Sequence, residues 1–256
     1  MRVALTGAAS GIGAEVAARL KEDGHHVTAF DLADPGAGVD RWIPVDLSDA
    51  AAIDRAVAGV EGPFEALINN AGLPPRDGLQ EQILALNFFG LRRFLEGMLP
   101  KLSAEASIVN TASRAGARWR ENIDEVKALL DLPRADLPGF IAERGITPVR
   151  AYDLSKEAVI VLTQALTERL IAKGLRINSV SPAAVSTGIL QDFAAAFGER
   201  MSKNVARVGR PGHAAEVAEV IVFLASPKSN WIKGQDLVVD GGMTAMATCD
   251  ALGVQG

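Results

Sequence analysis

The chain turns from a strand into a helix at Thr6-Gly7-Ala8-Ala9-Ser10-Gly11-Ile12-Gly13. Apolar residues 3–5 precede this turn, and a helical pattern follows it to about residue 23. Glycines permit a tight turn and close approach of a pyrophosphate, whose charge is met by free amides at the helix N-terminus. A plain strand-to-helix turn would show the same pattern, so the interpretation depends on the rest of the chain.

Short apolar stretches recur along the chain with amphipathic helical segments between them. They lie at residues 3–5, 27–30, 42–45, 66–68, 107–110, 177–180 and 237–239. Strands that alternate with helices predict a parallel sheet covered on both faces. We therefore predict a doubly wound α/β fold with seven strands. A chain of 256 residues, 48% of them hydrophobic, is expected to form one domain over residues 1–256.

Composition and charge exclude several classes of function. The net charge of −5 and the pI near 5.3 disfavour a nucleic-acid surface, which would be basic. Cys249 is the only cysteine, so no intrachain disulfide is possible. Residues 1–6 already read as a strand, which leaves no room for a signal peptide, and no apolar run approaches the twenty residues of a membrane span. We expect a soluble, cytoplasmic protein, and we assign no metal site.

Polar residues follow several of the predicted strands where each one ends. Asp31 closes the second strand, twenty residues after Gly11, and Ser113 follows the fifth strand. In open parallel sheets the ligand crevice lies beyond the carboxyl ends of the strands, so these side chains should meet there. The other residues at strand ends are Asp46 and Leu47 after the third strand and Asn69, Asn70, Ala71 and Gly72 after the fourth.

The position of Asp31 also indicates which dinucleotide would bind. A carboxylate at the end of the second strand can accept hydrogen bonds from the adenosine ribose hydroxyls, whereas it would repel a 2′-phosphate. The sequence therefore predicts NAD(H) in preference to NADP(H). Alternatively, Asp31 only begins a solvated loop.

Tyr152 and Lys156 lie four residues apart in Ala-Tyr-Asp-Leu-Ser-Lys, residues 151–156. On a helix this spacing places both side chains on one face. A cation about 4 Å from a phenol would favour the phenolate by roughly three pKa units, which would make Tyr152 a useful general acid or base. An exposed lysine beside a packed tyrosine gives the same spacing, so the pair alone does not decide the function.

Asn87 lies among apolar neighbours in a predicted helix over residues 80–100. A buried amide costs free energy unless it is hydrogen-bonded, so we expect a water or backbone partner for it. A purely structural partner would satisfy the amide equally well.

Taken together, these motifs resemble the short-chain dehydrogenase/reductase family over nearly the whole chain. The cofactor turn is matched by residues 6–13, the strand-four motif by residues 69–72, and the catalytic tetrad by Asn87, Ser113, Tyr152 and Lys156. Residues 176–182 are similar to the family's sixth strand and residues 234–242 to its last strand. The resemblance implies a Rossmann fold and an NAD cofactor contacted by Gly7, Ser10, Gly11, Ile12, Gly13, Asp31, Asp46, Leu47, Asn70, Ala71, Gly72, Tyr152, Lys156, Pro182, Val185 and Thr187.

The resemblance also implies a role for each member of the tetrad. Tyr152 would exchange a proton with the substrate oxygen, and Ser113 would position that oxygen. Lys156 would hold the nicotinamide ribose and favour the phenolate, while Asn87 would anchor a water on the proton path. Hydride would pass between the nicotinamide and the substrate carbon. A homodimer or homotetramer is typical of the family.

Three stretches depart from the family pattern. Ala183 and Gly188 replace a usual glycine and proline near the nicotinamide, and the segment between Asn70 and Asn87 is short. Ser113 and Tyr152 are 39 positions apart, about three times the usual spacing. This combination is similar to the 3-alpha-hydroxysteroid dehydrogenase/carbonyl reductase branch.

The long spacing implies a helical insertion at about residues 114–150. We predict short helices over residues 121–130 and 137–144, broken by Pro133 and Pro138. Their apolar residues would either wall the substrate cleft or pack on neighbouring helices and alter subunit contacts. The apolar residues in question are Trp119, Leu129, Leu130 and Phe140.

Two further features of the sequence concern the substrate. The arginines Arg114, Arg118 and Arg120 would suit either an anionic substrate or a solvated face. Residues 188–212, with Phe193, Phe197 and Met201 at helical spacing, resemble the family's mobile substrate lid. The tail from residue 243 has no assigned role.

The leading hypothesis is an NAD(H)-dependent oxidoreductase that interconverts a secondary alcohol and a ketone, on a hydroxysteroid or another bulky cyclic molecule. A general carbonyl reductase or dehydrogenase for small aromatic or aliphatic compounds is the second hypothesis. A non-catalytic, NAD-sensing protein is the third, and the intact Ser113, Tyr152 and Lys156 argue against it.

Overall fold

The computed structural model describes residues 1–254, apart from the side chain of Arg200; residues 255 and 256 of the predicted domain lie outside the described residues. Seven parallel strands form one sheet in the order β3-β2-β1-β4-β5-β6-β9, which confirms the predicted doubly wound sheet. The strands are β1 (Arg2–Thr6), β2 (His26–Asp31), β3 (Arg41–Pro44), β4 (Phe64–Asn69), β5 (Leu102–Thr111), β6 (Arg176–Pro182) and β9 (Asp236–Val239).

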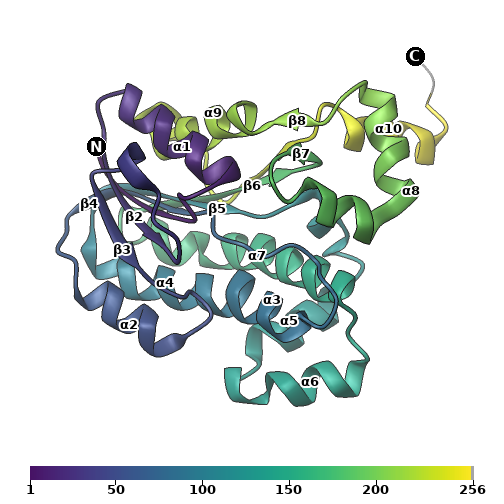
Figure 1. Ribbon diagram of the computed structural model, residues 1–256, viewed down its shortest axis with the longest axis horizontal. Coiled ribbons are helices and arrows are strands. Elements are labelled where there is room, and N and C mark those ends of the chain that lie inside the picture. The colour runs from purple at the N-terminus through teal and green to yellow at the C-terminus, as the bar shows by residue number, and fades with distance from the viewer. Residues whose placement is uncertain (255–256) are drawn as a thin grey trace.

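Helices cover both faces of this sheet (Figure 1). On one face α1 and α9 pack through a core that includes Val16, Leu20 and Ile221, and on the other face α2, α4 and α7 lie against the sheet. The helices are α1 (Gly11–Glu22), α2 (Ala50–Ala58), α3 (Gln80–Leu84), α4 (Leu91–Met98), α5 (Ile123–Asp131), α6 (Leu137–Arg144), α7 (Pro148–Ile171), α8 (Leu190–Val208), α9 (Ala214–Ala225) and α10 (Met243–Leu252). None of the described helices is both long enough and apolar enough to cross a membrane.

The predicted helix over residues 80–100 is interrupted by a π-helical segment, Ala85–Gly90, between α3 and α4. A β-carbon placed on Gly90 would lie 1.9 Å from the Leu47 carbonyl oxygen. Glycine therefore lets this helix approach the end of β3 closely. π-Helical turns are rare and often occur at functional sites, and this one carries the buried Asn87.

The 114–150 segment forms the two predicted helices as α5 and α6, which extend beneath α7 in Figure 1. Pro138 does not break a helix but occupies the first turn of α6, where a missing N–H costs nothing. Thr147 then caps α7 by accepting a hydrogen bond from the Arg150 N–H at 3.2 Å. The helix α7, which carries Tyr152 and Lys156, therefore begins four residues before Tyr152.

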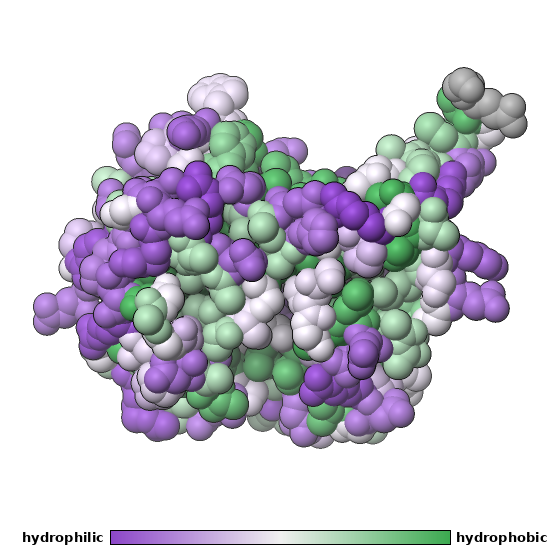
Figure 2. Space-filling view, turned by 45° about the horizontal axis from the view of Figure 1, so that its top comes forward, coloured by the Kyte–Doolittle hydropathy of each residue, from purple (hydrophilic) through white to green (hydrophobic). Residues whose placement is uncertain are grey.

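Two short strands that the sequence did not predict bracket α8. β7 (Val185–Ser186) pairs with β8 (Gly212–His213). The chain segment between these strands, which contains α8, therefore begins and ends at neighbouring points of the fold. Within α8, Gly198 has φ 48° and ψ −130°, a conformation suited to glycine, and it divides the helix in two. Figure 2 shows one face of the molecule, on which hydrophobic residues lie between hydrophilic clusters, both in the middle of the face and at its margins.

Candidate active site

The main cavity, of about 490 Å³, lies beyond the carboxyl ends of β1, β2, β4, β5 and β6. The sheet register aligns these ends because Thr6 pairs with Asn69 and Asn69 pairs with Asn110. We call this cavity the cleft. It brings together all but two of the predicted site residues, and the two exceptions are Gly13 and Asn87.

The glycine turn between β1 and α1 is packed too tightly for larger residues. Gly7 has φ +72°, and a β-carbon on it would lie 2.7 Å from the Ala71 Cα atom. A β-carbon on Gly13 would lie 1.8 Å from the Gly7 carbonyl oxygen. Ser10 begins α1 without a side-chain cap, so the first amides of the helix remain available to a phosphate. Gly13 therefore supports the turn from behind rather than lining the cleft.

Asp31 lies in the cleft at the end of β2. Its Oδ2 accepts a hydrogen bond from the Ala9 N–H at 2.9 Å, and its Oδ1 accepts one from the Ala33 N–H at 3.0 Å. Each oxygen keeps a second lone pair for a ligand hydroxyl. The residues immediately after it are Leu32 and Ala33, which carry no charge that would attract a phosphate.

Asn70, which follows β4, is hydrogen-bonded to residues at the ends of β1 and β5 and so links three strand ends at the cleft. Its Nδ2 donates to the Gly7 carbonyl at 3.1 Å, its Oδ1 accepts from the Thr111 hydroxyl at 3.3 Å, and its N–H donates to the Thr6 hydroxyl at 2.9 Å. These bonds fix the backbone of Ala71 and Gly72 at the cleft surface. Asp46 and Leu47, from the turn after β3, complete this wall.

The loop after β6 closes the dinucleotide part of the cleft from the other side. Pro182, Val185 and Thr187 all line the cleft, as predicted from the sequence. A β-carbon on Gly11 would lie 3.4 Å from the Thr187 methyl group, so this loop touches the glycine turn. Ala183 and Gly188, the two departures from the family pattern, lie in the same wall.

The Tyr152 phenol is hydrogen-bonded to the Ser113 hydroxyl. Only 6% of Tyr152 is exposed, and burial raises the pKa of its phenol to about 12. The hydrogen bond from Ser113 lowers that pKa, and the nearby Asp153 carboxylate raises it. The expectation that Lys156 would lower the pKa of Tyr152 is therefore wrong in this structure, because burial of the phenol has the larger effect.

Lys156 is also buried, with 4% of the residue exposed. Its Nζ lies 5.7 Å from the centroid of the Tyr152 ring and donates to the Thr111 carbonyl at 2.9 Å. Burial disfavours the charged amine and lowers its pKa to about 8. The ammonium is thus engaged with β5 and lies over the Tyr152 ring, and it is not among the groups that shift the pKa of the phenol.

Asn87 lies behind Gly72 rather than in the cleft. Its Oδ1 accepts from the Leu73 N–H at 2.7 Å, and its Nδ2 donates to the Leu73 carbonyl at 3.0 Å and to the Ser155 hydroxyl at 3.3 Å. This satisfies the predicted need for a backbone partner. A β-carbon on Gly72 would lie 3.4 Å from Asn87 Oδ1 and 3.5 Å from Lys156 Nζ, so the two side chains face the same glycine.

Aromatic side chains of α8 cover Tyr152. The Phe193 ring lies 5.3 Å from the Tyr152 ring, edge to face, and stacks on Phe197 at 6.2 Å. Arg76, in the loop after β4, forms a two-pronged ion pair with Asp192 at 2.8 and 3.0 Å. α8 is therefore held across the cleft, over the phenol.

The 114–150 segment contributes polar residues to the cleft, not the apolar wall considered from the sequence. Leu129 and Phe140 are buried against α3 and α7, and neither they nor Trp119 and Leu130 line the cleft. The side chains of this segment that do line it are those of Arg114, Ala115, Arg118, Asn122 and Arg150. Sequence reasoning missed Asn122 and Arg150, and also Met243 at the start of α10, because their places depend on tertiary contacts.

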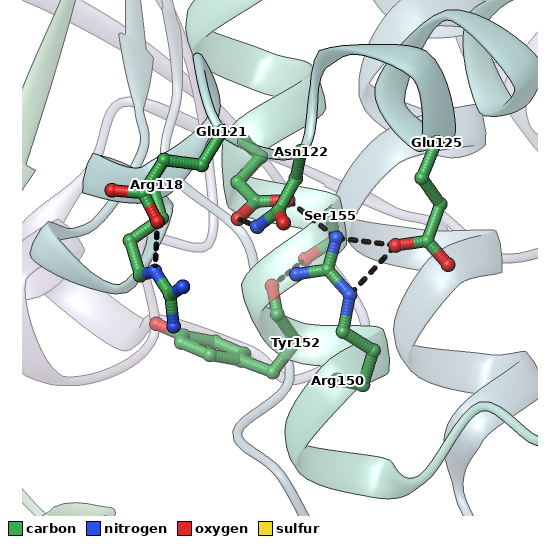
Figure 3. A network of polar contacts seen from close by, with 8 residues as sticks. Arg118, Glu121, Asn122, Glu125, Arg150, Tyr152 and Ser155 are labelled. Carbon is green, nitrogen blue, oxygen red and sulfur yellow. Dashed lines mark hydrogen bonds and ion pairs between the residues drawn. The ribbon is translucent and has the colours of Figure 1, made fainter.

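A network of charged and polar side chains joins this segment to α7 (Figure 3). Arg150 donates to Glu125 at 2.6 and 2.9 Å and to Glu157 at 2.7 Å, and Asn122 donates to Glu157 at 2.6 Å. Glu157 is almost fully buried, and its charge is compensated by Arg150. The network therefore fixes α5 to the helix that carries Tyr152 and Lys156. No three His, Cys, Asp or Glu side chains within residues 1–254 are grouped as metal ligands.

Comparison with known families matches two adjacent models. The model described as short chain dehydrogenase matches residues 2–123, and the model described as enoyl-(acyl carrier protein) reductase matches residues 139–244. Residues 124–138, which form most of α5 and the start of α6, fall between the two.

Two curated relatives and one solved structure resemble almost the full chain. A coniferyl-alcohol dehydrogenase of Pseudomonas sp. strain HR199 is 32% identical over 95% of this chain and 96% of its own. A 3-alpha-hydroxysteroid dehydrogenase/carbonyl reductase of Comamonas testosteroni is 28% identical with the same coverage. The crystal structure of the 3-alpha-hydroxysteroid dehydrogenase from Pseudomonas sp. B-0831, complexed with NADH, is 32% identical and has a TM-score of 0.85, covering 96% of this chain and 98% of that one.

Proposed function

Because the chain belongs to the short-chain dehydrogenase/reductase family, whose members oxidise alcohols or reduce ketones, we propose that it uses NAD(H) to interconvert a secondary alcohol and a ketone on a bulky cyclic substrate. The observation that carries this proposal is the buried Tyr152 phenol, hydrogen-bonded to Ser113 at the base of the cleft with Lys156 behind its ring. A proton donor, an oxygen-positioning hydroxyl and a cation thus face one cavity.

Each side chain of this group has a distinct task in the proposed reaction. With a pKa near 12, Tyr152 keeps its proton at neutral pH and donates it to the carbonyl oxygen during reduction. Ser113 holds the same oxygen by a hydrogen bond. Lys156 and Asn87 both face Gly72. Lys156 would return a proton to Tyr152, and Asn87 would anchor a water on this proton path. The nicotinamide, when bound, supplies or accepts the hydride.

The preference for NAD(H) over NADP(H) follows from Asp31. Both of its oxygens are oriented by backbone N–H groups, and both keep a lone pair for a ribose hydroxyl. We expect kcat/KM with NADH to exceed that with NADPH at least tenfold. Asp31→Ala should lower the ratio of kcat/KM with NADH to kcat/KM with NADPH, because it removes the charge that repels a 2′-phosphate. A wild-type preference for NADPH would contradict the assignment.

The bulky cyclic substrate is supported by the aromatic side chains of α8 and by the relatives. The stacked Phe193 and Phe197 lie over Tyr152 and offer a flat apolar surface to a ring. Two of the similar proteins are named for hydroxysteroids. We therefore place hydroxysteroids and other cyclic alcohols first. Small aromatic or aliphatic alcohols are the alternative substrate class, supported by the relative named for coniferyl alcohol.

One assay tests the activity and separates it from NAD sensing without turnover. Steroid alcohols, cyclic alcohols and coniferyl alcohol are incubated with NAD and the purified protein, and absorbance is followed at 340 nm. Turnover of a cyclic or steroid alcohol supports the proposal, and turnover of coniferyl alcohol alone supports the alternative. NADH binding without turnover of any alcohol would indicate a sensor.

We further propose that the protein is a homo-oligomer. Trp231 is 95% exposed, and Phe223 and Val238 also expose more than a third of their surface. Phe223 belongs to α9, Val238 to the edge strand β9, and Trp231 to the connection between these two elements. Light scattering should give at least twice the 26.9 kDa chain mass, and Trp231→Glu should reduce it.

A further inference from the structure

Arg118 lines the cleft one short helical turn after Ser113. Ser113 caps that turn, Arg114–Arg118, by accepting a hydrogen bond from the Ala115 N–H at 3.1 Å. The Arg118 guanidinium therefore belongs to a short capped turn that directly follows Ser113, the residue hydrogen-bonded to Tyr152. In the view of Figure 3, it lies at the hydroxyl end of the Tyr152 ring, and both residues line the same cavity.

The hydrogen-bonding capacity of Arg118 is only partly used. Its Nε donates to Glu121 at 2.7 Å, and among the described residues its two terminal nitrogens make no hydrogen bond. The pair is exposed, at 64% for Arg118 and 62% for Glu121. Exposed ion pairs contribute about 0–1 kcal/mol, so a ligand can compete for this guanidinium.

The other cleft arginines are held by buried or half-buried acids. Arg150 donates to both Glu125 and Glu157, and Arg114 lies 3.5 Å from Asp240, whose side chain is 6% exposed. These arginines neutralise carboxylates of the protein and are fixed by them. Arg118 differs from both, because its acidic partner is in solvent.

We propose that Arg118 is a specificity-determining residue that binds a carboxylate on the ring of the substrate. This inference rests on the proposed alcohol–ketone activity and specifies its substrate class as cyclic hydroxy acids. The two terminal nitrogens of a guanidinium match the two oxygens of a carboxylate, and such paired bonds are stronger than those to a neutral acceptor. The substrate hydroxyl would lie at Tyr152, with its ring against Phe193.

The charges on the opposite wall determine where the carboxylate goes. Asp153 lines the α7 side of the cleft close enough to Tyr152 to raise the pKa of the phenol. Arg118 attracts an anion on the side of the 114–150 segment, away from this carboxylate. The substrate is therefore oriented with its carboxylate away from α7.

A matched pair of substrates tests the proposal by turnover. 4-Hydroxycyclohexanecarboxylate and its methyl ester differ in charge but share the ring and the alcohol. Wild-type kcat/KM with NAD should be roughly 10- to 100-fold higher for the acid, as expected for a charged, paired hydrogen bond. Arg118→Gln should remove most of this preference, mainly by raising KM for the acid. Arg120→Gln is the control, because Arg120 stacks on Trp119 and does not line the cleft.

Replacement of Glu121, the acid that competes for the Arg118 guanidinium, should change KM for the acidic substrate in the opposite direction. Glu121→Gln frees the guanidinium, so KM for the acid should fall a few-fold, while KM for the ester should not change. An equal kcat/KM of the wild type for acid and ester would overturn the proposal. So would an Arg118→Gln variant that slows both substrates by the same factor.

A binding measurement separates this inference from the proposed function. Cyclohexanecarboxylate, which has no alcohol to oxidise, is titrated calorimetrically into the protein saturated with NADH. The inference expects saturable binding that weakens at least tenfold in Arg118→Gln and is kept in Arg120→Gln. Equal binding by all three proteins overturns the role of Arg118 even if cyclic alcohols are oxidised. Arginine-dependent binding without oxidation of any alcohol would contradict the proposed activity instead.

Discussion

The two halves of the cleft are built differently. The dinucleotide half consists largely of backbone at the ends of strands, with glycines where a single extra carbon would collide with the turns that follow β1 and β4. The substrate half consists of side chains from α8 and from the 114–150 segment. In the first half, the positions of the strand ends and glycines along the sequence determine the shape of the site. In the second half only the tertiary packing decides which side chains face the cavity.

Tyr152 lies where the two halves meet, and its removal should give the largest effect. Tyr152→Phe deletes the hydroxyl that bonds to Ser113 but keeps the ring that packs on Phe193. We expect kcat to fall by roughly 10²- to 10⁴-fold, as for loss of a general acid. The Kd for NADH, measured by fluorescence titration, should change less than threefold. Wild-type turnover in this variant would remove the basis of the proposed mechanism.

The second prediction tests whether the apolar residues of the 114–150 segment anchor it. Leu129 is fully buried in the cluster that also holds Phe140 and Leu154. Leu129→Ala should lower the free energy of unfolding by about 2–5 kcal/mol because it leaves a cavity. Lys127→Ala, on the exposed side of the same helix, should cost less than about 0.5 kcal/mol in urea titrations. A small loss for Leu129→Ala, with a large change in substrate KM, would instead place Leu129 at the cleft.

The sequence was sufficient to predict the dinucleotide half. Each of the seven strands contains a short apolar run, and parallel strands bring their carboxyl ends to one edge. Gly7, Asp31 and Asn70 follow such runs directly, so their meeting at the cleft required no knowledge of side-chain packing. The same holds for Tyr152 and Lys156, because helical spacing alone places them on one face.

The substrate half could not be predicted in this way. Leu129 and Phe140 looked as suitable for a cleft wall as for a core, and only their packing on α3 and α7 decides between the two. The pKa of Tyr152 was misjudged for a related reason. The sequence shows that a cation is near, but the degree of burial that outweighs it is a property of the folded chain.

The third prediction probes the steric limit in the dinucleotide half. Gly13→Ala places a carbon 1.8 Å from the Gly7 carbonyl and 2.5 Å from Asn70 Nδ2, so α1 or the turn must move. We expect a loss of about 1–3 kcal/mol in unfolding free energy and weaker NADH binding. Gly139→Ala, in a helix with nothing within 4 Å, should be neutral or slightly stabilising. Equal behaviour of the two variants in calorimetry and NADH titration would contradict the steric account.

The last prediction concerns Lys156, whose burial destabilises the charged amine and lowers its pKa to about 8. Between pH 8 and about 10 the unfolded chain holds a proton there that the folded chain has released, so stability should rise with pH. This residue alone should contribute up to about 1.4 kcal/mol per pH unit in that window. In Lys156→Met the contribution is absent, so wild type should gain stability relative to the variant as pH rises. The raised pKa of Tyr152 acts in the opposite direction only above about pH 10, so urea titrations at pH 7.5, 8.5 and 9.5 isolate the lysine. The control is Lys173→Met, which changes a lysine at an exposed position. If the free energies of unfolding of wild type and Lys156→Met changed in parallel over this pH range, Lys156 would not be desolvated in the folded chain.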